Sequence, residues 1–109
     1  MKSKIESYIG FAIKKGSVVF GCDSIERYKK KIFVLLETQS LSPNSRKVME
    51  KCRVKFDCKL FEIEDFDFLK NKNCKALAIC DTSLADAIVK VKEAEDKNGA
   101  HINKSRQRF

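Results

Sequence analysis

The arrangement of apolar and polar residues along the chain predicts alternating helices and strands. Apolar residues recur every three or four positions between Ser3 and Lys15, which predicts an amphipathic helix that ends at Gly16. A short β-rich run follows from Val18 to Phe20, and Ile32 to Leu36 is a longer apolar run. An unbroken apolar run of strand length predicts a strand that is buried on both faces of a sheet.

A second helix is predicted between these two strands, from Asp23 to Lys31. Asp23 is a suitable N-terminal cap, and Glu26 three residues later completes the pattern of a capping box. Arg27 and the lysines at positions 29–31 fall in its last turns, where positive charge complements the helix dipole. This helix is therefore expected to be short and basic at its C-terminal end.

The second half of the chain predicts a helix, a strand, a short helix, a strand and a last helix. The first is a helix capped by Ser42. A strand from Lys59 to Ile63, a short helix from Glu64 to Lys70 and a strand from Ala76 to Cys80 follow. The last is a helix capped by Thr82 or Ser83. Such alternation predicts a sheet sandwiched between helices. The helical period ends after Glu95, so residues 1–97 are expected to form one domain and residues 98–109 a basic, disordered tail.

Charge adds to this picture, because the sequence has 23 basic residues and only 15 acidic ones, and its formal net charge is +8. An excess of this size favours polyanionic partners such as nucleic acid. A solvated, lysine-rich surface is the alternative. The acidic stretch from Glu62 to Asp67 argues against RNA contact there and predicts a charge-polarised molecule whose back face is acidic.

The five cysteines are expected to be reduced and mostly packed in the interior. Their number is odd, no Cys-x-x-Cys pair is present, and His101 is the only histidine of the sequence, so no metal site and no cofactor are predicted. No apolar run approaches the roughly 20 residues that span a bilayer, and the N-terminal residues do not resemble a signal peptide. A cytoplasmic protein without membrane contact is therefore expected.

No catalytic pattern stands out in the sequence. The sequence offers no Ser/His/Asp or Cys/His set and no glycine-rich phosphate loop, so the protein is not expected to be an enzyme. Glu62, Glu64, Asp65 and Asp67 could bind a divalent ion, but an exposed acidic turn is the commoner explanation for such a cluster.

Three segments, taken in order, resemble a known family. They run from Ile9 to Gly21, from Leu41 to Lys47 and from Ala76 to Asp81. Their sequence and spacing are similar to the kink-turn-binding ribosomal protein superfamily, the L-seven-Ae and L-thirty-e type, and most of all to its small bacterial YlxQ-type members. The resemblance covers roughly residues 5 to 92. It implies an α/β fold, a three-layer α/β/α sandwich around a mixed four-stranded sheet.

The resemblance also implies where RNA binds. In that family a Gly-x-Asn-Glu-x-x-Lys stretch at the start of the second helix holds the RNA, and the matching stretch here runs from Gly21 to Arg27. Asp23, Ser24 and Arg27 stand where the family has Asn, Glu and Lys. RNA binding is therefore expected, while kink-turn specificity is left open. The loop before the last strand, Asn71 to Lys75, touches RNA in the family as well.

We therefore expect a protein that binds structured RNA and is associated with the ribosome or with translation. The residues expected to bind a kink-turn or rRNA-like RNA are Lys14, Lys15, Gly21, Cys22, Asp23, Ser24, Arg27, Lys30, Lys72, Asn73 and Lys75. The cations among them are expected to converge near one end of the domain. Two alternatives remain: Asp23 serves only as a helix cap, and the basic run from Arg27 to Lys31 is only a solvated face. The alternative function is a protein–protein adaptor with the same fold and no specific RNA target.

Overall fold

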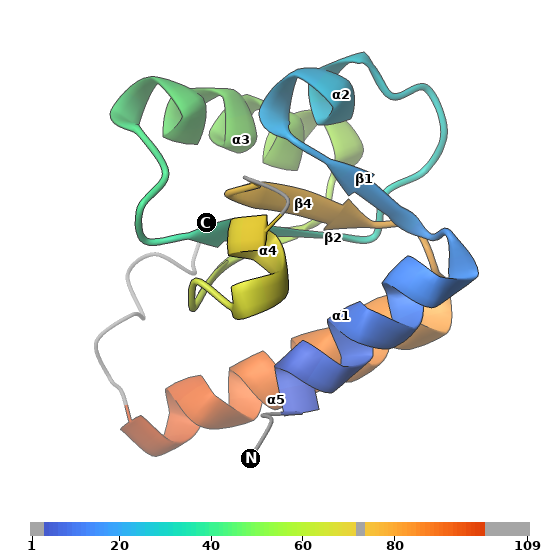
Figure 1. Cartoon of the computed structure of the whole chain (residues 1–109), viewed down its shortest axis with the longest axis vertical. Helices are drawn as coiled ribbons and strands as arrows, with labels where there is room; N and C mark the ends of the chain where they lie inside the picture. The colour runs from blue at the N-terminus through green and yellow to red at the C-terminus, as the bar shows by residue number, and fades with distance from the viewer. Residues whose placement is uncertain (1–3, 72–73, 100–109) are drawn as a thin grey trace.

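The protein folds as alternating helices and strands. We describe it from a computed structural model, of which residues 4–71 and 74–99 are described (Figure 1). The helices are α1 (Lys4–Lys15), α2 (Cys22–Arg27), α3 (Pro43–Phe56), α4 (Asp67–Asn71) and α5 (Thr82–Gly99). The strands are β1 (Val18–Phe20), β2 (Val34–Thr38), β3 (Lys59–Ile63) and β4 (Ala76–Ile79).

The four strands form one mixed sheet in the order β1-β4-β2-β3. β4 runs antiparallel to both of its neighbours, so that Ile79 lies opposite Val18 on one side and Val34 on the other. β3 runs parallel to β2, with Lys59 opposite Val34. The last strand in the sequence therefore lies inside the sheet rather than at its edge.

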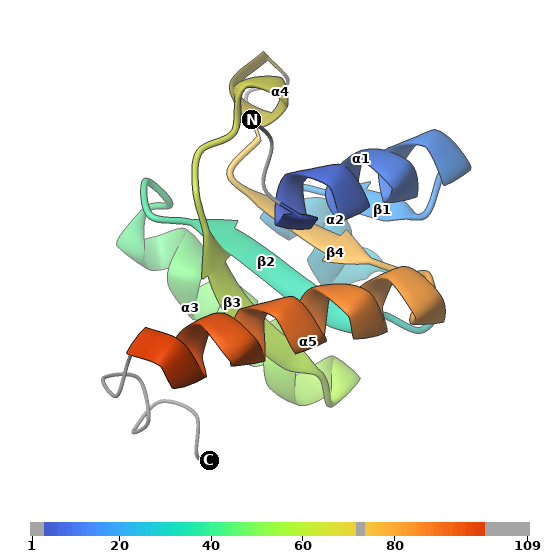
Figure 2. The same cartoon turned by 90° about the horizontal axis from the view of Figure 1, so that it is seen from below.

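Helices cover both faces of this sheet, and the expected three-layer α/β/α sandwich is confirmed. On one face, Ile25 of α2 and Met49 of α3 pack in a cluster with Leu35 and Ala78. On the other face, α1, α4 and α5 contribute to a second cluster, in which Ile9 and Ile88 are completely buried. Figures 1 and 2 show α2 and α3 on one side of the sheet and α1 and α5 together on the other.

Strand β2 shows why an unbroken apolar run is a buried strand. Val34 and Leu36 belong to the cluster under α1 and α5, whereas Leu35 belongs to the cluster under α2 and α3. The strand nevertheless begins two residues later than predicted and continues through Glu37 and Thr38, which are 8% and 0% exposed. These polar residues are buried because they have hydrogen-bonding partners, and an apolar pattern does not reveal such partners.

Helix α2 ends earlier than predicted. It stops at Arg27 because Tyr28 adopts an extended conformation, with φ −66° and ψ 137°. The lysines at positions 29–31 therefore lie in the loop to β2, and their assignment to the last turns of a helix is wrong. Gly21 is the N-cap residue, with φ +90° and no side-chain cap, so Asp23 lies within the first turn and does not cap it.

Two other helix starts test the predicted caps. Ser42 accepts a hydrogen bond of 3.2 Å from the amide of Ser45, which confirms it as the cap of α3. Helix α5 is capped by Asp81, whose Oδ1 accepts from the amide of Leu84 at 2.9 Å, rather than by Thr82 or Ser83. The residue that precedes the first helical residue supplies the cap, and the predicted caps lie one and two residues too late.

The C-terminal helix is longer than its apolar period suggested. α5 continues to Gly99, so the first two residues of the expected tail, 98 and 99, are helical. The rest of that tail, residues 100–109, lies outside the described residues. Within the described ranges, no helix has both the length and the apolar character that a membrane span requires.

Candidate nucleic-acid interface

The start of α2 and the start of β4 lie together at one end of the sheet. The amide of Gly21 donates a hydrogen bond of 2.9 Å to the carbonyl oxygen of Ala76. Lys75 comes immediately before that strand, and its side chain is exposed. The structure therefore brings Gly21 and Lys75 to the same end, as the resemblance implied. Lys72 and Asn73, which were expected to join them, lie outside the described residues.

The three residues after Gly21 differ in what they offer to a ligand. Asp23 and Ser24 are exposed, whereas the Cys22 thiol is half-buried and donates to the carbonyl oxygen of Ser45 at 3.8 Å. Burial raises the pKa of Cys22, so its thiol is protonated at neutral pH. Cys22 therefore joins α2 to α3, and only its two neighbours present exposed side chains.

Lys14 and Lys15 lie at the other end of β1. The carbonyl oxygen of Ser17, at the beginning of that strand, accepts a hydrogen bond of 2.8 Å from the amide of Cys80 at the far end of β4. Three strand residues, about 10 Å, separate this end from Gly21. Lys15 also forms an ion pair with Asp81. The prediction that all the cations converge near one end is therefore wrong, because Lys75 lies at the opposite end of the sheet from Lys14 and Lys15.

Arg27 and the lysines after it are also remote from Gly21. Helix α2 has six residues, which separates its two ends by about 9 Å. The loop that follows leads into β2, where the amide of Phe33 donates to the carbonyl oxygen of Ile79 at 3.0 Å. Arg27 and Lys30 are therefore separated from Gly21 and Lys75. They lie at the same end of the sheet as Lys15, but in the opposite helical layer.

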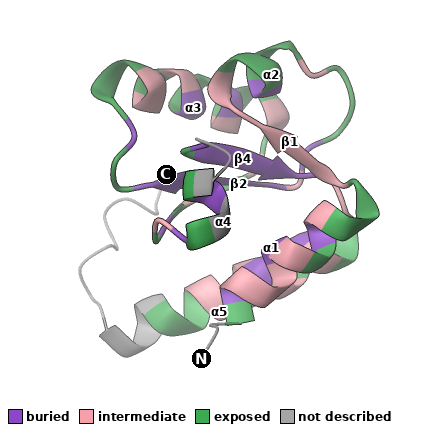
Figure 3. Cartoon of the chain, viewed as in Figure 1, coloured by how far each residue is buried: buried purple, intermediate pink, exposed green. Residues whose placement is uncertain are grey.

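The loop after α2 and the end of α3 enclose an open pocket, which we call the basic pocket. It is lined by residues 26–33 and 55–58. Its lining carries five cations and two carboxylates, and so a net charge of +3. Residues 29–31, in the middle of the loop, are exposed (Figure 3). The structure therefore gathers five cations from two separate segments of the chain in one concave site.

The cations of the basic pocket differ in their partners. Arg27, Lys29, Lys30 and Lys31 are exposed, and none of the four forms an ion pair with any residue in the described part of the chain. Lys55 donates from Nζ to the backbone carbonyl of Glu26 at 2.7 Å, which ties α3 to α2. Lys55 was not expected in the site, because nothing near it in the sequence indicates that the two helix ends meet.

The thiols around the basic pocket are poor nucleophiles. Burial raises the pKa of Cys58, which lines the pocket, to about 11, and it also raises the pKa of Cys52. Tyr28 forms a hydrogen bond with Cys80, and that bond raises the pKa of the Tyr28 hydroxyl. Among the residues that the structure describes, no three His, Cys, Asp or Glu side chains are placed to hold a metal ion. The pocket is therefore suited to binding anions rather than to thiolate chemistry.

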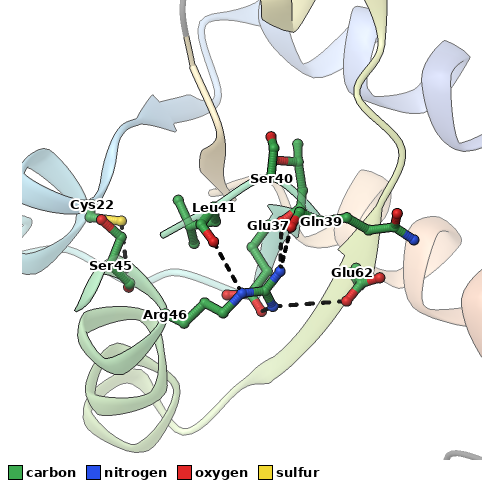
Figure 4. Close-up of polar contacts among 9 residues, drawn as sticks. Cys22, Glu37, Gln39, Ser40, Leu41, Ser45, Arg46 and Glu62 are labelled. Carbon is green, nitrogen blue, oxygen red and sulfur yellow. Dashed lines mark hydrogen bonds and ion pairs between the residues drawn. The ribbon is translucent and has the colours of Figure 1, made fainter. Parts of the chain in front are cut away.

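Arg46 forms a second polar cluster, at the end of the sheet where Gly21 lies (Figure 4). Its guanidinium donates to the carbonyl oxygens of Leu41 at 3.2 Å and Gln39 at 2.9 Å, and to the carboxylate of Glu37 at 3.0 Å. Its Nη1 also lies 3.8 Å from the carboxylate of Glu62. These contacts hold the β2–α3 loop in place and leave the guanidinium engaged within the protein.

The acidic stretch is also partly engaged. Besides the contact of Glu62 with Arg46, Asp65 accepts a hydrogen bond of 3.0 Å from the hydroxyl of Ser40. These contacts tie the end of β3 to the β2–α3 loop, at the end of the sheet opposite to the basic pocket. The acidic stretch therefore lies at the opposite end of the domain from the basic pocket.

Comparison with known proteins agrees with the fold and adds no function. No protein-family model matches this chain, and no curated protein matches it. Among solved structures, a protein of unknown function from Bacillus halodurans C is similar, with a TM-score of 0.72 over 82% of this chain and 96% of that chain. The two sequences are 8% identical. Similarity at this level shows that the two chains share a fold.

Proposed function

We propose that the protein binds structured RNA through the basic pocket. The observation that carries the proposal is that Arg27, Lys29, Lys30 and Lys31 line a concave site without an ion pair to any described residue. Many other cations of the described chain are paired: Lys15, Arg46, Lys51, Arg53, Lys59, Lys90 and Lys92. Unpaired cations in a concave site attract phosphates and gain affinity by releasing counterions.

The dipoles of the two helices account for only part of this charge. Arg27 and Lys55 lie in the last turns of α2 and α3, where a cation complements the partial negative charge of the helix end. The lysines at positions 29–31 lie beyond both helix ends, and the dipole effect falls off within the last turn. Their charge therefore remains available to an external anion.

The family resemblance supports the same assignment. Arg27 stands where the kink-turn-binding proteins have their RNA-contacting lysine, and its planar guanidinium can bind a phosphate or a guanine edge through two parallel hydrogen bonds. We propose a role at the ribosome or in translation, and a cytoplasmic location. Five free cysteines agree with a reducing compartment. The proposed activity is binding, without catalysis.

Charge reversal at three positions tests the proposal. Binding of a kink-turn RNA and of an unrelated hairpin is titrated by filter binding for Arg27→Glu, Lys75→Glu and Lys90→Glu. Arg27→Glu should weaken binding at least about 30-fold, because it replaces an attraction to phosphate with a repulsion. Lys90→Glu is the matched control, since Lys90 lies on α5 and pairs with Asp86 at 3.2 Å.

The outcomes separate the possible sites. Wild-type affinity for Arg27→Glu together with a large loss for Lys75→Glu would move the RNA site to the end of the sheet where Gly21 lies. Equal loss for both RNAs in Arg27→Glu keeps the site and argues against kink-turn specificity, since Ser24 replaces the family's glutamate. Failure of the wild-type protein to bind either RNA at low salt would favour the adaptor alternative.

A further inference from the structure

Aromatic side chains lie among the cations of the basic pocket. Tyr28, Phe33 and Phe56 line it, and each is half-buried. Phe33 packs against the core cluster under α1 and α5, and Phe56 packs against the cluster under α2 and α3. One side of each phenylalanine is therefore supported by the core, while the residue still contributes to the pocket surface.

The geometry around Phe56 is fixed by its neighbours. The Nζ atom of Lys55 lies 4.9 Å from the centre of the Phe56 ring and donates to the carbonyl oxygen of Glu26. The carboxylate of Glu26 lies 4.0 Å from Nζ of Lys51. The ring and the ammonium group are thus held together by contacts between α2 and α3, which gives the pocket an apolar wall beside its exposed lysine side chains.

We infer that the basic pocket binds a nucleotide unit, with its phosphate on the loop lysines and its base against Phe33 or Phe56. This inference rests on the proposed function and makes it more specific. Cations alone would favour any anion, including inorganic phosphate. Sites that combine a cationic surface with aromatic rings favour nucleic acid strands, because each base can stack on a ring while its phosphate meets a positive charge.

The pocket chemistry fits binding without reaction. The Cys58 thiol in the pocket wall is protonated at neutral pH, and the carboxylates of the lining, Glu26 and Asp57, are outnumbered by cations. Two ligands share the chemistry of a phosphate joined to a base: an unpaired stretch of RNA and a free nucleotide. The experiment separates them.

Removal of the bases from a short RNA tests the role of the aromatic wall. Calorimetric titrations compare an adenosine tetranucleotide with the same ribose-phosphate chain lacking its bases, so that the number of phosphates is constant. Each is titrated into the wild type, Phe56→Leu and Phe11→Leu. Phe56→Leu keeps an apolar side chain of similar volume, and Phe11→Leu is the matched control because Phe11 is 55% exposed on α1.

The wild type should bind the base-containing chain about tenfold more tightly, the effect of one base on one aromatic ring. In Phe56→Leu this advantage should shrink, and in Phe11→Leu it should persist. Competition by adenosine monophosphate would identify a free nucleotide as a ligand. A base advantage without that competition would identify RNA. Thermal melting of each variant verifies folding. Phe33→Leu is the second ring variant, and it should lose the base advantage if the base lies on Phe33 instead of Phe56.

Equal affinity for the two chains in the wild type would overturn the inference. If the two chains bind equally and Arg27→Glu nevertheless weakens RNA binding, the proposed function stands and only the inferred contact with the base is rejected. If Arg27→Glu has no effect on RNA while the base advantage depends on Phe56, the pocket binds nucleotides but the proposed RNA site fails. The two failures therefore give different results.

Discussion

Arg46 joins the first turn of α3 to strand β2 by a hydrogen bond of 3.0 Å from Nη1 to Oε2 of Glu37. The Glu37 side chain is only 11% exposed, so its carboxylate depends on this partner for much of its stabilisation. The same guanidinium donates to the backbone carbonyl of Thr38 at 3.2 Å. Arg46 therefore stabilises a mostly buried acid near the end of a central strand.

Arg46→Met should lower the free energy of unfolding by about 2 to 4 kcal/mol, because it removes one ion-pair partner of a mostly buried carboxylate and a donor to three backbone carbonyls. Urea denaturation measures the change. Lys90→Met is the control, since Lys90 pairs with Asp86 one helical turn away, both side chains are exposed, and a pair of this type contributes only a few tenths of a kcal/mol. Similar losses in the two variants would contradict the role assigned to Arg46.

The pairing of Asp81 with Lys15 predicts a loss of stability in acid. The hydrogen bond from Lys15, together with the amide of Leu84, lowers the pKa of Asp81 below its ordinary value of 3.8. A lowered pKa in the folded state means that the stabilisation is present above the ordinary value and is lost as the pH falls through the folded value.

Asp81→Asn retains an oxygen that can cap α5 but removes the charge. The thermal midpoint of this variant should therefore depend less on pH between pH 7 and pH 3 than that of the wild type. Midpoints measured by circular dichroism at both pH values test this expectation. An unchanged difference between the two pH values would show that the Lys15–Asp81 pair makes no contribution.

The raised pKa of Cys58 predicts that the protein loses stability in alkali. Its pKa is raised by burial from 9.0 to about 11 in the folded protein. Since the unfolded chain loses the thiol proton first, the stabilisation is complete below pH 9 and is lost as the pH rises through about 11. Alkylation of Cys58 by iodoacetamide, followed by mass spectrometry, should show its reactive midpoint near the higher value. The same thiol in urea is the control, and equal midpoints in the two conditions would contradict the prediction.

Binding of RNA should weaken steeply with salt. If each of the four unpaired cations of the basic pocket meets one phosphate, the logarithm of affinity should fall with the logarithm of salt concentration at a slope of roughly −3 to −4. Lys30→Gln should bring that slope closer to zero by about one unit. Filter binding over a salt series gives both slopes. A slope near zero in the wild type would exclude phosphate contacts as the source of affinity.

The apolar pattern predicted the sandwich because the burial of an apolar strand depends on the residues of that strand themselves. Val34, Leu35 and Leu36 alternate between the two core clusters, and each needs only an apolar neighbour to be stable there. Glu37 and Thr38 could not be predicted as buried strand residues from the same pattern. Their burial depends on Arg46 and on Ser40, whose hydroxyl lies 3.0 Å from that of Thr38, and such partners become known only when the loop is folded.

The candidate site was less predictable because it depends on the order of strands in the sheet. Gly21 and Arg27 are close in sequence and were expected to act together, but α2 carries them to opposite ends of the sheet. Lys55 and Glu26 are far apart in sequence and meet through a hydrogen bond of 2.7 Å. Charge and composition predicted an anionic partner. The concave arrangement of the cations could not be predicted from them, because it depends on the tertiary structure.

The interior position of β4 affects how the protein can fold during its own synthesis. Phe20 pairs with Leu77, so β1 emerges from the ribosome long before the strand to which it binds. Until that strand arrives, β2 also has one row of unpaired amides and carbonyls facing the place that β4 will occupy. A nascent chain that stalls before Ala76 is therefore expected to present two open strand edges, which are sites for pairing with other chains and for recognition by chaperones.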